Sequence, residues 1–162
     1  LDAGSVLALS LVKKNSGDGR FMLFDHESHD VDVSLNESIV SAASRIHVMG
    51  GTDTGACLRQ LTQEKDAYDT VIIITDEQQN TGSPFYRELM RYRETVNPNA
   101  KAFVVDVAPY YGGMVPQTDK QTYYCFGWSE QVLEFIAMNL QGFGTLVERV
   151  EKLELPGTAV SA

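Results

Sequence analysis

Two short, almost purely apolar segments constrain the fold most strongly: DTVIIITD at 69–76 and KAFVVDVAP at 101–109. A strand that is half exposed alternates apolar and polar residues. A strand that is buried on both faces has no polar face and reads instead as a continuous apolar run. Both segments follow the second pattern, which predicts inner strands of a parallel sheet that helices cover on both faces.

Amphipathic helical patterns alternate with the strands, and this order is typical of α/β domains. We expect further strands at 20–26, 29–34 and 121–126, and helices at 2–14, 35–46, 83–96, 128–142 and 145–155, with one more helix after the GGTDT segment ending near Glu64. The fold class predicted from this order is a three-layer, Rossmann-like α/β domain. Its mostly parallel sheet would contain strands 20–26, 70–76 and 101–107, with the charged segment at 29–33 as an antiparallel edge.

The composition narrows the possible partners. The chain has 162 residues and a formal net charge of −9. One domain accounts for this length, and an acidic surface repels the phosphates of a nucleic acid. No apolar run approaches the roughly 20 residues that cross a bilayer, so no membrane contact is expected. Cys57 and Cys125 form no metal-binding pattern and are expected to be free thiols. We therefore expect a cytoplasmic protein.

Polar residues gather where the predicted strands end, which is where ligands bind in parallel α/β sheets. Asp25 closes one strand and Asp76 another, while Thr52 lies in the glycine-rich loop GGTDT. Hydroxyl and carboxylate oxygens favour Mg²⁺, Mn²⁺ or Ca²⁺. The alternative interpretation is structural, because Thr52 or Asp53 could cap the following helix and Asp76 could simply begin a turn.

The segments GGTDTGACLRQL and VIIITD, about twenty residues apart, resemble two metal-binding segments of the von Willebrand factor A domain. In that family a threonine of the first segment and an aspartate of the second belong to the metal-ion-dependent adhesion site. The resemblance assigns these roles to Thr52 and Asp76 here. The GGTD, TDEQQNTGSP and YCFGWSEQVLEFIA segments are most similar to the A domain of the Ro autoantigen family, whose members pair it with a ring-shaped, RNA-binding TROVE module.

One expected segment of an A domain is not found. The first strand of the family ends in Asp-x-Ser-x-Ser, which supplies three of the five site residues and lies in the middle of the sheet. This chain contains no such motif. Without that strand the sheet would split and its neighbours would keep unpaired backbone groups. We therefore expect a preceding segment that completes both the sheet and the metal site.

The resemblance implies a binding module rather than an enzyme, with an A domain over residues 1–153 and a disordered tail at 154–162. A divalent cation at Thr52 and Asp76 would bind an acidic side chain of a protein partner, and RNA would bind another domain of the parent protein. Two alternatives remain open. Asp25 and Asp76 could hold Mg²⁺ for phosphoryl transfer, or the domain could be a metal-free scaffold. The binding hypothesis predicts that Thr52 Oγ1 and the Asp76 carboxylate lie roughly 4–6 Å apart.

Overall fold

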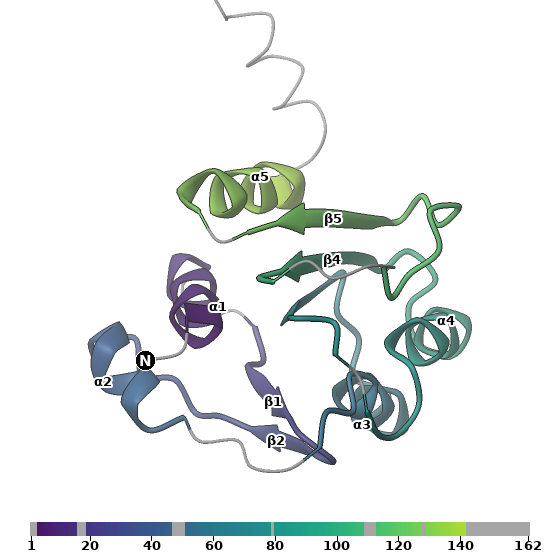
Figure 1. Cartoon of the computed structure of the whole chain (residues 1–162), viewed down its shortest axis with the longest axis horizontal. Coiled ribbons are helices and arrows are strands. Elements are labelled where there is room, and N and C mark those ends of the chain that lie inside the picture. The colour runs from purple at the N-terminus through teal and green to yellow at the C-terminus, as the bar shows by residue number, and fades with distance from the viewer. Residues whose placement is uncertain are drawn as a thin grey trace, which may run out of the picture.

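The computed structural model describes residues 3–15, 19–46, 51–78, 80–108, 113–127 and 129–141. Figure 1 shows the elements in chain order: α1 (Ala3–Lys14), β1 (Met22–Phe24), β2 (Ser28–Asp30), α2 (Ile39–Ser44), α3 (Ala56–Glu64), β3 (Thr70–Thr75), α4 (Phe85–Thr95), β4 (Lys101–Asp106), β5 (Thr122–Phe126) and α5 (Glu130–Gln141). The helix expected at 145–155 and the tail at 154–162 lie outside the described residues. None of the helices in the described ranges is long and apolar enough to cross a membrane.

A parallel three-stranded sheet of order β3-β4-β5 forms the centre of the fold. Ile73 lies opposite Val104 of β4, and Val104 lies opposite Tyr124 of β5. β4 is the inner strand, and its residues from Ala102 to Asp106 are all buried. The apolar pattern predicted this arrangement because only a strand with neighbours and helices on all sides excludes polar residues.

Alternate residues of β4 point into two different cores. Ala102 and Val104 belong to a cluster with residues of α3 and α4. Phe103 and Val105 belong to a second cluster with residues of α1 and α5. In Figure 1, α3 and α4 accordingly lie on one side of the sheet, and α1 and α5 on the other. The period-two alternation of a strand thus produces the predicted three-layer α/β fold.

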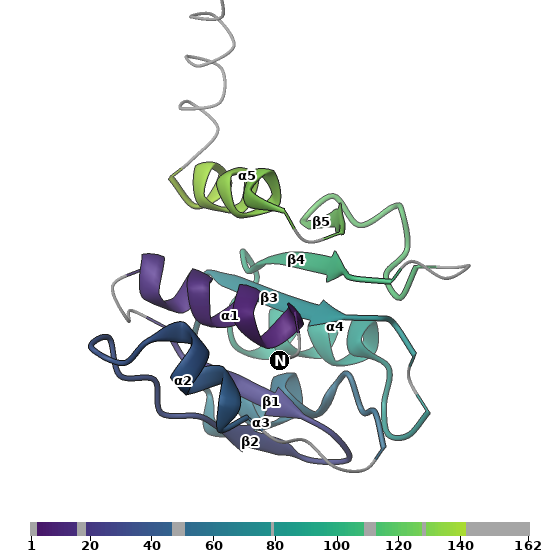
Figure 2. The same cartoon turned by 60° about the vertical axis from the view of Figure 1, so that its left-hand side comes forward.

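β1 and β2 form a separate antiparallel pair, with Met22 opposite Asp30. The antiparallel strand is confirmed. The expectation that strands 20–26 and 70–76 share one sheet is wrong for the described residues, because β3 pairs only with β4 and lies at the edge. Figure 2 shows β1 and β2 on the far side of β3 from β4. The described strands therefore form two sheets instead of the single predicted one.

The starts of two helices differ from the sequence prediction. The helix expected at 35–46 begins only at Ile39, because the Ser34 hydroxyl accepts a hydrogen bond from the Asn36 amide in a turn. The cap of α2 is Ser38, whose hydroxyl accepts the Ser41 amide at 3.1 Å. The helix expected at 83–96 begins at Phe85 and is preceded by Pro84. The missed signal is the local turn, which moves each start a few residues later.

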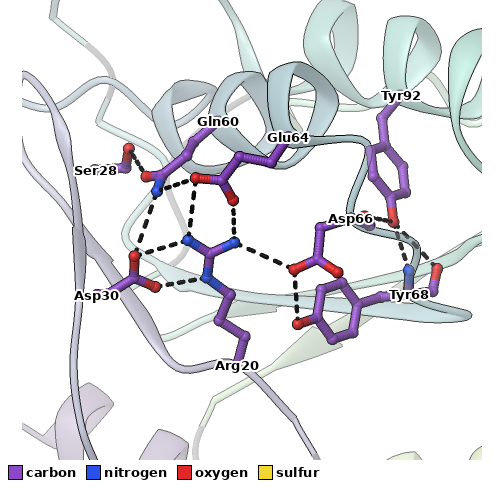
Figure 3. A network of polar contacts seen from close by, with 8 residues as sticks. All are labelled: Arg20, Ser28, Asp30, Gln60, Glu64, Asp66, Tyr68 and Tyr92. Carbon is purple, nitrogen blue, oxygen red and sulfur yellow. Dashed lines mark hydrogen bonds and ion pairs between the residues drawn. The ribbon is translucent and has the colours of Figure 1, made fainter.

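An ion-pair network joins the β1–β2 pair to the end of α3 (Figure 3). Arg20 pairs with Asp30 of β2 at 2.6 Å, with Glu64 of α3, and with Asp66 in the following loop at 3.2 Å. A planar guanidinium can donate to several carboxylates at once. Arg20 therefore links segments that are far apart in the sequence.

Both cysteines are free thiols, as expected. Cys57 on α3 is half-buried, and its Sγ lies 3.5 Å from the Leu23 carbonyl oxygen. Burial raises the pKa of the Cys57 thiol to about 12. It also raises the pKa of Cys125, which is the opposite of the lowered pKa that activates a cysteine nucleophile.

Candidate metal site at the strand ends

Thr52 is held by the loop that follows β3. Its amide donates to Asn80 Oδ1 at 2.8 Å, and its carbonyl oxygen accepts the amides of Asn80 at 3.1 Å and Thr81 at 3.3 Å. Both polar groups of the Thr52 backbone are therefore satisfied by a single short segment. That segment begins four residues after Asp76, so these contacts bring together the two loops that carry the predicted ligands.

Two glycines allow this close approach, one on each loop. A Cβ added to Gly51 would lie 2.8 Å from Thr81 Cγ2 and 3.0 Å from Asn80 Oδ1. A Cβ on Gly82 would lie 1.8 Å from Asp53 Oδ2. Gly82 also has a φ of +68°, a backbone conformation that residues with a side chain rarely adopt. Gly82 is therefore required at its position, whereas a side chain at Gly51 would displace the side chains of Asn80 and Thr81.

Asp53 anchors the other side of Thr52. Its side chain is only 2% exposed. Oδ1 accepts the Gly55 amide at 3.1 Å, and Oδ2 forms an ion pair with Arg59 on α3. The Asp53 amide donates to the Asp25 carbonyl oxygen at 2.6 Å, which adds the loop after β1 to the assembly.

The expected capping role of Thr52 or Asp53 is wrong. α3 begins at Ala56, its cap residue is Gly55, and no side chain makes a capping hydrogen bond. The Asp53 carboxylate accepts an amide that lies before the first helical residue, and its second oxygen is committed to Arg59. Thr54 contributes to a different helix, because its hydroxyl accepts the Phe85 amide at the start of α4.

A second buried carboxylate shares Arg59. Glu88 of α4 is 5% exposed, and its Oε1 lies 3.7 Å from Arg59. Glu88 Oε2 and Ser83 Oγ are buried and have no hydrogen-bond partner. One guanidinium therefore faces two carboxylates at the base of the loops. Sequence analysis missed Glu88 because it occupies an ordinary position of an amphipathic helix.

Asp76 directly follows β3 and is half-buried. Its Oδ1 accepts the Gln78 amide at 3.1 Å, which is the turn that the structural alternative anticipated. The next residue, Glu77, has a φ of +60°. Its carboxylate lies 3.5 Å from the Met114 amide, and burial raises its pKa. Thr52 is also half-buried, so a cation could approach both predicted ligands.

A histidine contact at Asp25 was missed from the sequence. His26 Nδ1 lies 3.1 Å and His29 Nε2 lies 3.2 Å from Asp25 Oδ1. The residues between them form a tight turn, which brings both rings to one oxygen. The Glu27 amide also donates to this oxygen, and mainly for that reason the pKa of Asp25 falls from 3.8 to about 2.

Asp106 is a further strand-end carboxylate that the sequence analysis did not single out. It is the last residue of β4 and is 1% exposed. Its Oδ1 accepts the Ala108 amide at 3.0 Å. The signal was present in the sequence, since Asp106 ends an apolar run as Asp76 does.

The donor chemistry fits a hard cation, but the donors are few. Thr52 supplies a hydroxyl and Asp76 a carboxylate, whereas Mg²⁺ is surrounded by about six oxygen ligands. Among the residues that the structure describes, no group of three or more His, Cys, Asp or Glu side chains could hold a metal. Thr52 and Asp76 thus amount to part of a site.

A parallel sheet between two helical layers, with polar loops at the strand ends, defines a three-layer α/β domain of the von Willebrand factor A class. The sequence model of one family in this class, the Ro60 vWA domain, matches residues 2–139. The chain therefore belongs to the Ro60 vWA domain family.

A solved structure has the same fold. The Ro (RSR) protein of Deinococcus radiodurans matches with a TM-score of 0.65 at 17% sequence identity. The match covers 79% of this chain and 27% of the Deinococcus chain, so the present chain spans a minor part of the length of that protein. Among curated protein sequences no relative matches.

Proposed function

We propose that this domain is a metal-dependent protein-binding module within a larger, Ro-like RNA-binding protein. The observation that carries the proposal is the contact between the Thr52 loop and the loop after Asp76. It supports a shared cation because the two loops bearing oxygen donors meet at the strand ends. Membership of the Ro60 vWA domain family supports the same assignment.

In the proposed site, the Thr52 hydroxyl and the Asp76 carboxylate hold a Mg²⁺ or Mn²⁺ ion. A complete site needs further oxygen donors besides these two. The bound cation supplies a positive centre for an acidic side chain of a partner protein. RNA binds elsewhere in the parent protein, since a net charge of −9 disfavours a phosphate backbone on this domain. The proposal assigns no chemical reaction to the site.

The proposal predicts that Asp76→Ala removes metal binding from the parent protein and leaves the fold intact. Deleting this half-buried carboxylate removes a metal ligand and also relieves its repulsion, in the metal-free state, with the further acidic donors that the proposed site needs. Without metal, the melting temperature should therefore hold or rise. The increase that millimolar Mg²⁺ or Mn²⁺ gives the wild type, which grows with the logarithm of metal concentration over Kd, should vanish.

Thermal melting of the wild type, Asp76→Ala and Gln78→Ala with and without metal tests this prediction. Gln78 is exposed and lies in the same loop, so its variant should respond to metal like the wild type. A wild type with no metal-dependent shift would instead favour a metal-free scaffold. That second candidate function is supported by the absence of a three-residue cluster among the described His, Cys, Asp and Glu residues.

A further inference from the structure

We propose that Asn80 is a positioning residue that orders Thr52 before any ion binds. The inference rests on the proposed function and deepens it, because it names the residue that sets the geometry of one ligand. Asn80 would not touch the cation. It would act through the Thr52 backbone, and its loss would weaken cation binding while the fold remains.

The first step of the argument is the pattern of hydrogen bonds. Thr52 and Asn80 exchange two bonds: the Thr52 amide donates to Asn80 Oδ1, and the Asn80 amide donates to the Thr52 carbonyl oxygen. Asn80 Oδ1 accepts the Thr52 amide in the way that a backbone carbonyl oxygen does between paired strands. The pair therefore fixes the peptide groups on both sides of the Thr52 Cα, and with them the direction of its side chain.

The second step is that Thr52 has restraints on both sides. Arg59 holds the buried carboxylate of the following residue, Asp53. The side chains of Asn80 and Thr81 occupy the space beside the preceding residue, Gly51, where a Cβ would lie. Of these restraints, the ion pair belongs to the buried base of the loops. Asn80 is exposed and can be replaced without opening the core.

The third step concerns energy. A hydrogen bond of this kind contributes about 0.5–1.5 kcal/mol net, which corresponds to a change of roughly 2- to 10-fold in an equilibrium constant. A loop that is already ordered before the ion binds loses little conformational entropy on binding. Removing the Asn80 acceptor should therefore weaken cation binding by roughly this factor and should not abolish it.

The first experiment measures hydrogen exchange of the Thr52 amide in the metal-free parent protein. Asn80→Ala should exchange roughly 2- to 10-fold faster than the wild type. Asn80→Asp keeps an acceptor oxygen of the same shape and should restore the protection, and Gln78→Ala should leave it unchanged. Equal exchange in Asn80→Ala and the wild type would overturn the proposal. Unchanged melting temperatures would show that each variant folds.

The second experiment titrates the same proteins with Mn²⁺. Faster exchange together with a Kd for Mn²⁺ raised roughly 2- to 10-fold in Asn80→Ala supports the positioning role. Faster exchange with an unchanged Kd would overturn it. If the wild type takes up no Mn²⁺, the proposed function fails, and the metal-free exchange measurement alone decides whether Asn80 orders Thr52.

Discussion

At the scale of single residues, the contact between the two loops depends on the absence of side chains. Gly82 combines a left-handed backbone with a neighbour, Asp53, that fills the space of a Cβ. Gly127 has a similar φ of +80°, but nothing lies within 4 Å of its Cβ position. Substitutions at both positions would strain the backbone, but only a substitution at Gly82 would also cause a steric clash.

Gly82→Ala should lower the free energy of unfolding by considerably more than Gly127→Ala. The left-handed backbone alone costs an alanine about 1–2 kcal/mol, and both variants carry that cost. Only Gly82→Ala also displaces the buried Asp53 carboxylate from the half-buried Arg59, and a hydrogen bond between charged groups contributes about 1.5–3 kcal/mol. Urea unfolding of both variants measures the difference. Equal losses would show that the Asp53 contact contributes nothing.

At the scale of elements, Arg20 connects the β1–β2 pair with α3 and the loop after it (Figure 3). Hydrogen bonds from Arg20 are the main cause that lowers the pKa of Asp30 and of Glu64 from their ordinary values of 3.8 and 4.5. A lowered pKa means that the ionised carboxylates stabilise the fold. That contribution is complete above the ordinary values and is lost as the pH falls below them.

Arg20→Gln should therefore lower the free energy of unfolding at pH 7 by about 1 kcal/mol, since partly exposed pairs are screened by solvent. The difference from the wild type should shrink as the pH falls below about 4, where the carboxylates become protonated. Chemical unfolding at pH 7 and pH 3 measures it. Arg45→Gln is the matched control, because Arg45 is more exposed than Arg20 and pairs with Glu37 alone among the described residues, so its loss should cost less. A difference that persists undiminished at pH 3 would contradict the electrostatic explanation.

At the scale of the whole molecule, β3 and β4 differ in their neighbours. Among the strands that the structure describes, β4 has a partner on each side, whereas β3 pairs with β4 alone. A strand with one partner keeps some of its amides unpaired. This asymmetry should be visible in the behaviour of the isolated chain.

Backbone amides of β3 should on average exchange with solvent faster than those of β4. All inner-strand amides are paired, while an edge strand leaves roughly every second amide without a partner. Residue-resolved hydrogen exchange of 70–75 and 101–106 compares the two strands. Equal protection would mean that β3 has a second neighbouring strand in solution.

The sequence predicted the features that depend on local patterns, and it did not predict contacts between residues that are far apart in the chain. The inner strands and the helices were predictable, because burial on both faces leaves a local pattern such as that around Ile73 and Val104. The contacts of Thr52 with Asn80 and of Arg59 with Asp53 and Glu88 were not. They depend on how loops and helices pack in three dimensions, and no local pattern encodes that a particular asparagine oxygen meets a particular amide.

The mutual fit of the two loops has a consequence for how such a domain can change. Because Gly51 faces Asn80 and Gly82 faces Asp53, the effect of a substitution in one loop depends on the residue present in the other. Paired substitutions across this contact should be strongly non-additive. Transplanting the Thr52 loop alone onto another scaffold would leave its backbone without the partners that hold it, so the two loops must be transferred together.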